Sequence, residues 1–207
     1  MNIYPHSCTL TDLKGLLASA VSPRPIAWIS TLDRCNPGGW NLAPFSSCTP
    51  VSCRPPLIVI GASRREDGKQ KDTILNIISN GEFVVNCLTR SLIGQMVATS
   101  GACGAEGDEF WRVGVTPQAA AVVSVPRIAE CKIHIECRLF QHQEVGKEVA
   151  DLVLGEVVCV HIEDSIASGN TFVDFGGLRG RQYVPLGALA IGYYLSERGV
   201  EYYPNPG

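Results

Sequence analysis

Two neighbouring segments, Ser22-Pro-Arg-Pro-Ile-Ala-Trp-Ile-Ser-Thr-Leu-Asp33 and Asn41-Leu-Ala-Pro-Phe-Ser-Ser47, say most about this chain. Residues 26–31 alternate as a strand does, residues 33–39 are dense in turn residues, and residues 40–47 return as the partner strand. The returning strand ends in two small hydroxyl residues. Such a hairpin is suited to present backbone amides and hydroxyls to a bound anion, so we expect a flat aromatic ligand that carries a phosphate.

The rest of the chain reads as short helices between strands. Periodicity predicts helices over 9–20, 73–79 and 91–100, strands over 57–61, 83–88, 129–140, 155–162 and 186–195, and loops over 63–70, 101–114 and 163–182. Thr11 or Asp12 is expected to cap the first helix and Asp72 the second, which Asn80-Gly81 would end. Many strands and few helices predict a small closed barrel, although periodicity alone does not separate a barrel from a sandwich.

Composition sets limits on the function. The 207 residues suit one domain over 1–207, with 45% hydrophobic and 18% charged residues. Lys and Arg number 17 against 20 Asp and Glu, so no broad basic field is available for nucleic acid, and a bound phosphate must be met by local groups. No apolar run approaches a membrane span, and the run before Leu16-Leu-Ala-Ser-Ala20 is too short for a signal peptide.

The nine cysteines form no Cys-x-x-Cys pair, which favours reduced thiols and a cytoplasmic location. His134 and Glu136 share a strand face, and His142 and Glu144 repeat the spacing, but two ligands at a two-residue step are common by chance. We therefore expect no metal site. The sequence also lacks a P-loop, a Gly-x-Ser-x-Gly elbow, a His-Glu-x-x-His motif and a Rossmann fingerprint.

Five sequence blocks carry a family resemblance. They are, in order, Pro23-Arg-Pro-Ile-Ala-Trp28, Asn41-Leu-Ala-Pro-Phe-Ser46, Pro55-Pro56, Lys71-Asp-Thr73 and Gly81-Glu-Phe-Val-Val-Asn86, with weaker similarity in Pro126-Arg-Ile-Ala-Glu130, Ile135-Glu-Cys137 and Leu154-Gly-Glu-Val-Val158. In this order the blocks resemble the flavin reductase-like family of FMN-binding split barrels. The resemblance implies a mainly β fold, an antiparallel split β-barrel of Greek-key type with a few peripheral helices.

The resemblance also implies where FMN would bind. The phosphate would meet Lys71, the amides of the following helix and the hydroxyl of Thr73, while Asp72 would repel it unless the carboxylate caps that helix. The remaining contacts, to phosphate, ribityl chain or ring, would come from Arg24, Trp28, Asn41, Leu42, Ala43, Pro44, Phe45, Ser46, Ser47 and Tyr193.

Several of these residues have a simpler interpretation. Lys71 could be a solvated surface charge and Arg24 a structural ion-pair partner, while Trp28 and Phe45 lie on an alternating strand and could belong to the core. The family often ends with Pro-x-Gly-Arg, whereas this chain has Ala188 in place of the arginine, which leaves any contact of that arginine open.

The function implied is that of an FMN-dependent oxidoreductase. Hydride would pass from NADH or NADPH to the flavin and on to an acceptor that the sequence does not reveal, with no side chain needed as catalytic acid or base. Two alternatives stay open: an FMN-binding electron carrier or flavin-holding module without nicotinamide activity, and a barrel that has lost its cofactor. The resemblance further implies a homodimer.

Overall fold

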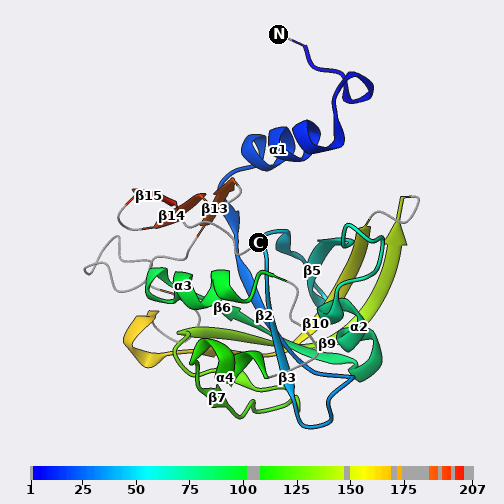
Figure 1. Cartoon of the computed structure of the whole chain (residues 1–207). Coiled ribbons are helices and arrows are strands. Elements are labelled where there is room, and N and C mark those ends of the chain that lie inside the picture. The colour runs from blue at the N-terminus through cyan, green and yellow to red at the C-terminus, as the bar shows by residue number, and fades with distance from the viewer. Residues whose placement is uncertain are drawn as a thin grey trace.

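The computed structural model describes residues 2–101, 108–146 and 150–168 and, as backbone only, the segments 172–173, 187–190, 193–196 and 199–202. Side chains are described as far as residue 166. Within this part the molecule is mainly β, as predicted (Figure 1).

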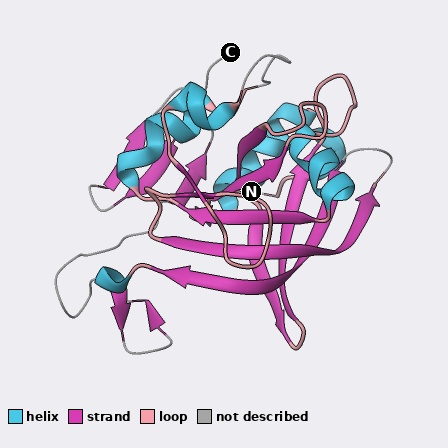
Figure 2. Cartoon of the chain, turned by 90° about the horizontal axis from the view of Figure 1, so that it is seen from below, coloured by secondary structure: helices cyan, strands magenta, loops and turns pink. Residues whose placement is uncertain are grey.

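A seven-stranded antiparallel sheet forms the body of the molecule, in the order β3-β2-β6-β9-β10-β5-β4 (Figures 1 and 2). Its strands are β2 (Ala27–Leu32), β3 (Trp40–Phe45), β4 (Cys48–Cys53), β5 (Pro56–Ser63), β6 (Glu82–Cys87), β9 (Ile133–Val145) and β10 (Ala150–Ile162). β3 and β4 follow each other in the chain with only Ser46 and Ser47 between them, yet they lie at opposite edges of the sheet. The sheet must therefore curl until its edges meet, which makes it a barrel.

The core has two main parts, one on each face of β2. Ala27 and Ile29 pack with Phe83 and the apolar residues of β5, whereas Trp28 packs on the other face with residues of the helices that cover it. A strand that is covered on both faces is buried along its length. β2 is therefore held firmly inside the structure, and it carries β3, its hairpin partner, at the edge of the sheet.

Within the described residues, four α-helices accompany the sheet: α1 (Leu10–Ala20), α2 (Asp72–Asn80), α3 (Ile93–Ala98) and α4 (Glu109–Val113). Thr9 caps α1 by accepting a bond from the Asp12 amide, so the predicted caps Thr11 and Asp12 were placed too late. α1 buries none of its residues and stands apart from the barrel in Figure 1. None of the described helices is long and apolar enough to cross a membrane.

The ends of α2 agree only partly with the prediction. Lys71 is the N-cap residue and no side chain caps the helix, so the predicted capping role of Asp72 is wrong. Asp72 is instead paired with Arg65. Gly81 ends the helix in a left-handed conformation at φ 73°, as Asn80-Gly81 indicated.

Other predictions differ in extent. The helix predicted over 91–100 begins as a 3-10 turn at Arg90–Leu92, and α4 lies in the predicted loop 101–114. β4 was not predicted. The remaining elements are η1 (Pro5–Ser7), β1 (Arg24–Pro25), β7 (Pro117–Gln118), β8 (Arg127–Ile128), η3 (Asp164–Ile166), β11 (Ala167–Ser168), β12 (Phe172–Val173), β13 (Gly187–Ala190), β14 (Tyr193–Ser196) and β15 (Gly199–Tyr202).

Candidate functional site

A pocket of about 210 Å³ lies between the edge strand β3 and the start of α2. We call it the β3–α2 pocket; it is lined by Asn41, Leu42, Ala43, Pro44, Arg65, Lys71, Asp72, Thr73, Thr99, Ser100, Gly101 and Glu109. The structure thus brings together two sequence blocks that are some thirty residues apart. Seven of the residues predicted to bind the ligand line it: Asn41, Leu42, Ala43, Pro44, Lys71, Asp72 and Thr73.

A hydrogen-bond network fixes the walls of this pocket. The Thr73 hydroxyl donates to Asn41 Oδ1 over 2.9 Å, and Asn41 Nδ2 donates to Glu109 Oε2 over 2.6 Å. The backbone amide of Leu42 donates to the same Glu109 oxygen. Glu109 and Thr73 are buried, so the network ties β3, α2 and α4 together in a water-poor setting where such bonds are strong.

The free edge of β3 offers acceptors to a ligand. Along this edge the outward-facing amide of Leu42 is already bound by Glu109, and Pro44, two residues further on, has no amide hydrogen. The amide and the carbonyl group of one residue in an antiparallel strand point to the same side, so the carbonyl oxygens of Leu42 and Pro44 also point outward. The edge therefore suits a ligand with an N–H group, rather than the anion that the hairpin alone suggested.

The anion-binding features lie at the other wall. The first turn of α2 has no side-chain cap; the Ile74 amide donates to the Lys71 carbonyl oxygen, which leaves the amides of Asp72 and Thr73 for an acceptor. The ammonium of Lys71 lies 5.2 Å from the centre of the Phe45 ring, and burial, followed by the nearby Arg65, lowers the pKa of Lys71. A bound anion beside Lys71 would stabilise its charged form and so oppose both the burial and the repulsion from Arg65 that lower its pKa. Because Thr73 donates its hydroxyl hydrogen to Asn41, the α2 amides are better placed than that hydroxyl to hold an anion.

Arg24 and Ser46 form a second polar group close to this wall. Arg24 donates from a terminal guanidinium nitrogen to the Ser46 hydroxyl over 2.9 Å. Its buried Nε has no hydrogen-bond partner among the described residues. Ser47 follows Ser46 in the link between β3 and β4 and is exposed, and none of the three residues lines the β3–α2 pocket.

The predicted aromatic contacts are placed in the core. Trp28 is fully buried, and its Nε1 donates to the Thr99 hydroxyl over 2.9 Å. Phe45 is buried beneath the Lys71 ammonium. The side chain of Leu42 is also buried, so it meets the pocket through its backbone. Trp28 supports the pocket through Thr99 and does not line it.

The last predicted contact lies mostly outside the described part. Tyr193 begins β14, where its backbone pairs with Tyr202, but its side chain is not among those described. Ala188, the position where the family often has arginine, pairs with Arg24 across β13 and β1. A residue at that position therefore sits directly beside the predicted phosphate or ribityl contact.

Sequence reasoning missed five residues of the pocket lining. Gly101 and Glu109 lie in the segment 101–114 that was interpreted as a loop, Thr99 and Ser100 follow the end of α3, and Arg65 was assigned to a charged loop. Asp108 caps α4 by accepting a bond from the Phe110 amide, and this Asp-Glu pair before Phe110 was the available signal for the helix that carries Glu109.

Comparison with known proteins agrees with this geometry. The family model for the flavin reductase like domain matches residues 19–181. The chain belongs to this family. Membership implies a flavin, either FMN or FAD, and the residues of the β3–α2 pocket fit one, because they offer carbonyl acceptors at one wall and cationic and amide donors at the other.

Three relatives place this flavin reductase-like chain more closely. An uncharacterised protein of Aquifex aeolicus is 34% identical over 90% of this chain and 91% of its own length. The crystal structure of nitrilotriacetate monooxygenase component B from Bacillus cereus is 26% identical, with a TM-score of 0.82 over 100% of this chain and 97% of the other. A Shewanella frigidimarina protein assigned as a flavin reductase with a split barrel domain is 22% identical, with a TM-score of 0.77 over 100% of both chains, and supports the fold.

Proposed function

We propose that this protein is an FMN-dependent oxidoreductase that accepts hydride from NADH or NADPH and passes electrons to a further acceptor. The observation that carries the proposal is the pairing, in one pocket, of an uncapped helix start beside Lys71 with the acceptor edge of β3. These two walls match the two polar ends of a flavin mononucleotide. The similarity to a monooxygenase component supports a role in delivering reduced flavin.

Each wall has its own task in this proposal. Lys71 and the first amides of α2 bind the phosphate, and Arg24 with Ser46 binds the phosphate or the ribityl chain. The carbonyl groups of Leu42 and Pro44 accept from the N–H of the ring. Bound flavin supplies the hydride chemistry, so the side chains need only bind, orient and exclude water, and none is assigned as acid or base.

The size of the pocket supports a homodimer. Its volume of about 210 Å³ is below the ~300 Å³ at the lower end of ligand pockets, so the described residues enclose only part of a flavin. Leu10, Leu17 and Val21 are 62%, 57% and 62% exposed on and just after α1. We propose that α1 packs against a second copy, which completes the site. Sedimentation that gives a monomer at micromolar concentration would contradict this.

The proposal is tested by absorption spectroscopy on the purified full-length protein. We expect the absorption spectrum of a bound flavin, either in the protein as isolated or after FMN is added. Anaerobic addition of NADH or NADPH should bleach this spectrum at a rate fast enough to support steady-state turnover. A protein that binds no flavin overturns the proposal. Bound flavin that chemical reductants bleach, but that neither nicotinamide reduces at a useful rate, would mark an electron carrier instead.

The location we propose is the cytoplasm, on the evidence of the cysteines. All eight cysteines in the described part are free thiols. Burial raises the pKa of Cys48 to about 12 and that of Cys87 to about 11, so these thiols stay protonated and unreactive at neutral pH. Reduced, inert thiols are the usual state in that compartment.

A further inference from the structure

Four side chains with metal-binding atoms meet on one face of β9 and β10. In the register of these strands Cys159 lies opposite Glu136, and His161 lies opposite His134. Residues two apart on a strand share a face, so the pairs form a square of one thiol, one carboxylate and two imidazoles. The sequence shows only that each strand carries two of these residues, and the register of the strands brings the two pairs together.

The distances suit a common ion. The ligand atoms of Glu136, Cys159 and His161 all lie within 4.8 Å of one another. Cys159 Sγ is 3.4 Å from His161 Nε2, close to the ~3.6 Å expected between sulfur and nitrogen on one tetrahedral zinc ion, given bonds of ~2.3 and ~2.0 Å. His161 Nε2 also contacts Glu136 Oε1. One nitrogen cannot donate its single hydrogen fully to both partners, whereas an ion between the three atoms would satisfy all of them.

The carboxylate is already oriented for such a role. The amides of Ala121, Val122 and Val123 donate to its two oxygens over 2.7, 2.7 and 3.1 Å, and Glu136 is fully buried. Metal-binding carboxylates are commonly held in this way by outer hydrogen bonds. These amides leave one lone-pair position on Oε1, which His161 occupies in the absence of an ion.

His134 supplies an independent sign of a missing partner. It is 4% exposed, and its Nε2 contacts the carbonyl oxygen of Ile128 over 2.8 Å, so that nitrogen carries the hydrogen. Its Nδ1 is then an acceptor, and it is buried without a hydrogen-bond partner among the described residues. The rings of His134 and His161 have their centres 6.2 Å apart. A water molecule bound to an ion beside His161 would provide the donor that Nδ1 lacks.

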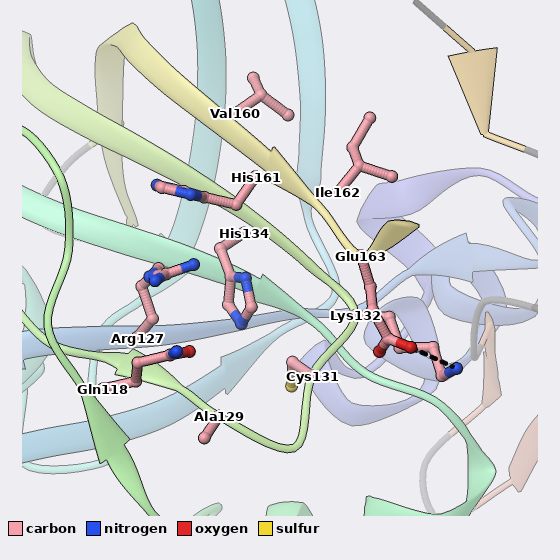
Figure 3. Close-up of a pocket in the computed structure, with 10 residues that line it drawn as sticks. All are labelled: Gln118, Arg127, Ala129, Cys131, Lys132, His134, Val160, His161, Ile162 and Glu163. Carbon is pink, nitrogen blue, oxygen red and sulfur yellow. Dashed lines mark hydrogen bonds and ion pairs between the residues drawn. The ribbon is translucent and has the colours of Figure 1, made fainter. Parts of the chain in front are cut away.

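The cluster has access to solvent away from the β3–α2 pocket. His134 and His161 line a second pocket of about 480 Å³, shown in Figure 3, whose lining shares no residue with the first. In Figure 3 His161 lies beside His134, while Val160 and Ile162 point the other way. An ion can therefore enter without passing the proposed flavin site.

We propose that Glu136, Cys159 and His161 bind one divalent late transition metal ion of the zinc class, with a solvent molecule in the fourth position next to His134. Sulfur, nitrogen and oxygen donors together favour such an ion over magnesium or calcium. On binding, the Cys159 thiol loses its proton to solvent and His161 shifts its hydrogen to Nδ1. One thiolate and one carboxylate then balance the two charges of the ion.

The test measures zinc binding by the full-length protein in competition with a chromogenic chelator. We expect one ion per chain with a dissociation constant in the micromolar range or tighter. Cys159→Ser and His161→Gln replace partly exposed side chains and should each weaken binding by ~100-fold or more, while His134→Gln should weaken it by ~10-fold. Cys53→Ser, an exposed thiol outside the cluster, is the matched control and should bind as the parent does.

A second readout identifies the sulfur ligand. Cobalt(II) added to the parent should give a thiolate-to-metal charge-transfer band in a difference spectrum against the metal-free protein, and Cys159→Ser should abolish it. Both measurements remain possible if Glu136→Gln fails to fold. The proposal is overturned if zinc does not bind stoichiometrically, or if the Cys159 and His161 variants bind it as tightly as the parent. The cluster would then only connect β9 to β10 by hydrogen bonds. Unchanged affinity in His134→Gln removes that residue from the site.

Discussion

Thr73 at the start of α2 donates its hydroxyl hydrogen to Asn41 on the edge strand β3, across 2.9 Å. Asn41 is held from its other side by Glu109. The two walls of the β3–α2 pocket are therefore fixed relative to each other before any ligand arrives. Preorganisation of this kind reduces the entropy that a ligand loses when it orders its site.

Removing that hydroxyl should weaken flavin binding. Thr73→Val keeps the shape of the side chain but removes the 2.9 Å donor to Asn41 Oδ1, which is half-buried and keeps only a longer bond of 3.4 Å from the Thr31 hydroxyl. A hydrogen bond of this kind contributes about 0.5–1.5 kcal/mol. We expect FMN affinity to fall by ~10-fold in a fluorescence titration. Thr73→Ser keeps the donor and should bind within ~3-fold of the parent. Equal affinity in all three proteins would show that the bond does not shape the pocket.

The role of Lys71 can be separated from that of the ring contacts by comparing FMN with riboflavin. A hydrogen bond to a charged group contributes about 1.5–3 kcal/mol, so Lys71→Met should weaken FMN binding by ~10- to 100-fold and leave riboflavin nearly unaffected. Lys69→Met is the matched control, because Lys69 is exposed and pairs with Asp67. Equal losses for both ligands would place the phosphate elsewhere.

Acid should destabilise the protein partly through Asp151. Burial raises the pKa of this carboxyl, but bonds from Gln70 and His142 and the charge of Arg64 outweigh burial and hold the pKa below its usual value. The stabilisation is therefore complete above the unfolded pKa of ~3.9 and is lost as pH falls through the lower folded value. Gln70 precedes Lys71, so the same carboxylate also anchors one side of the pocket.

Asp151→Asn tests this dependence. Removing one partner of a buried ion pair costs roughly 3–5 kcal/mol, so the variant should unfold at lower urea concentration at pH 7. Its stability should change less than that of the parent between pH ~5 and ~2, because the titrating group is gone. Parallel pH profiles for the two proteins would contradict the assignment.

Two glycines should respond in opposite ways to alanine. A Cβ at Gly155 in β10 would lie 2.8 Å from Phe83 Cε1 and 3.1 Å from Cys137 Cβ, inside the barrel core. Overpacking of this kind costs about 1–3 kcal/mol. Gly94 is in α3 with no atom within 4 Å of such a Cβ, so Gly94→Ala should stabilise by about 0.5–1 kcal/mol. The melting temperature should therefore fall in Gly155→Ala and rise in Gly94→Ala, relative to the parent.

Local patterns in the sequence predicted the first hairpin, α2 and its end at Gly81, because these features depend on neighbouring residues. The prediction that Asn41 and Lys71 share one site came from the family resemblance and not from local patterns. β4 was missed because its residues are mostly exposed and include Pro50, so neither hydrophobic runs nor alternation marked it. The cap of α2 was misassigned because Asp72 had a competing partner in Arg65.

Features that depend on pairing between distant strands had no signal in one sequence. Glu109 reaches Asn41 across 68 positions, and His161 meets His134 only through the register of β9 and β10. Trp28 and Phe45 each lie on a strand with alternating apolar residues, which fits either a core position or a ligand contact. Only the structure, in which both side chains are buried, assigns them to the core.

The link of Ser46 and Ser47 also has a consequence for the robustness of the fold. β3 and β4 are edge strands with no ladder between them, so only this short covalent link keeps the two rims of the sheet together, and a proteolytic nick or a circular permutation opened there would let the rims move apart. Unpaired rims recruit other chains. Such a molecule should aggregate even though every strand and every core side chain is retained.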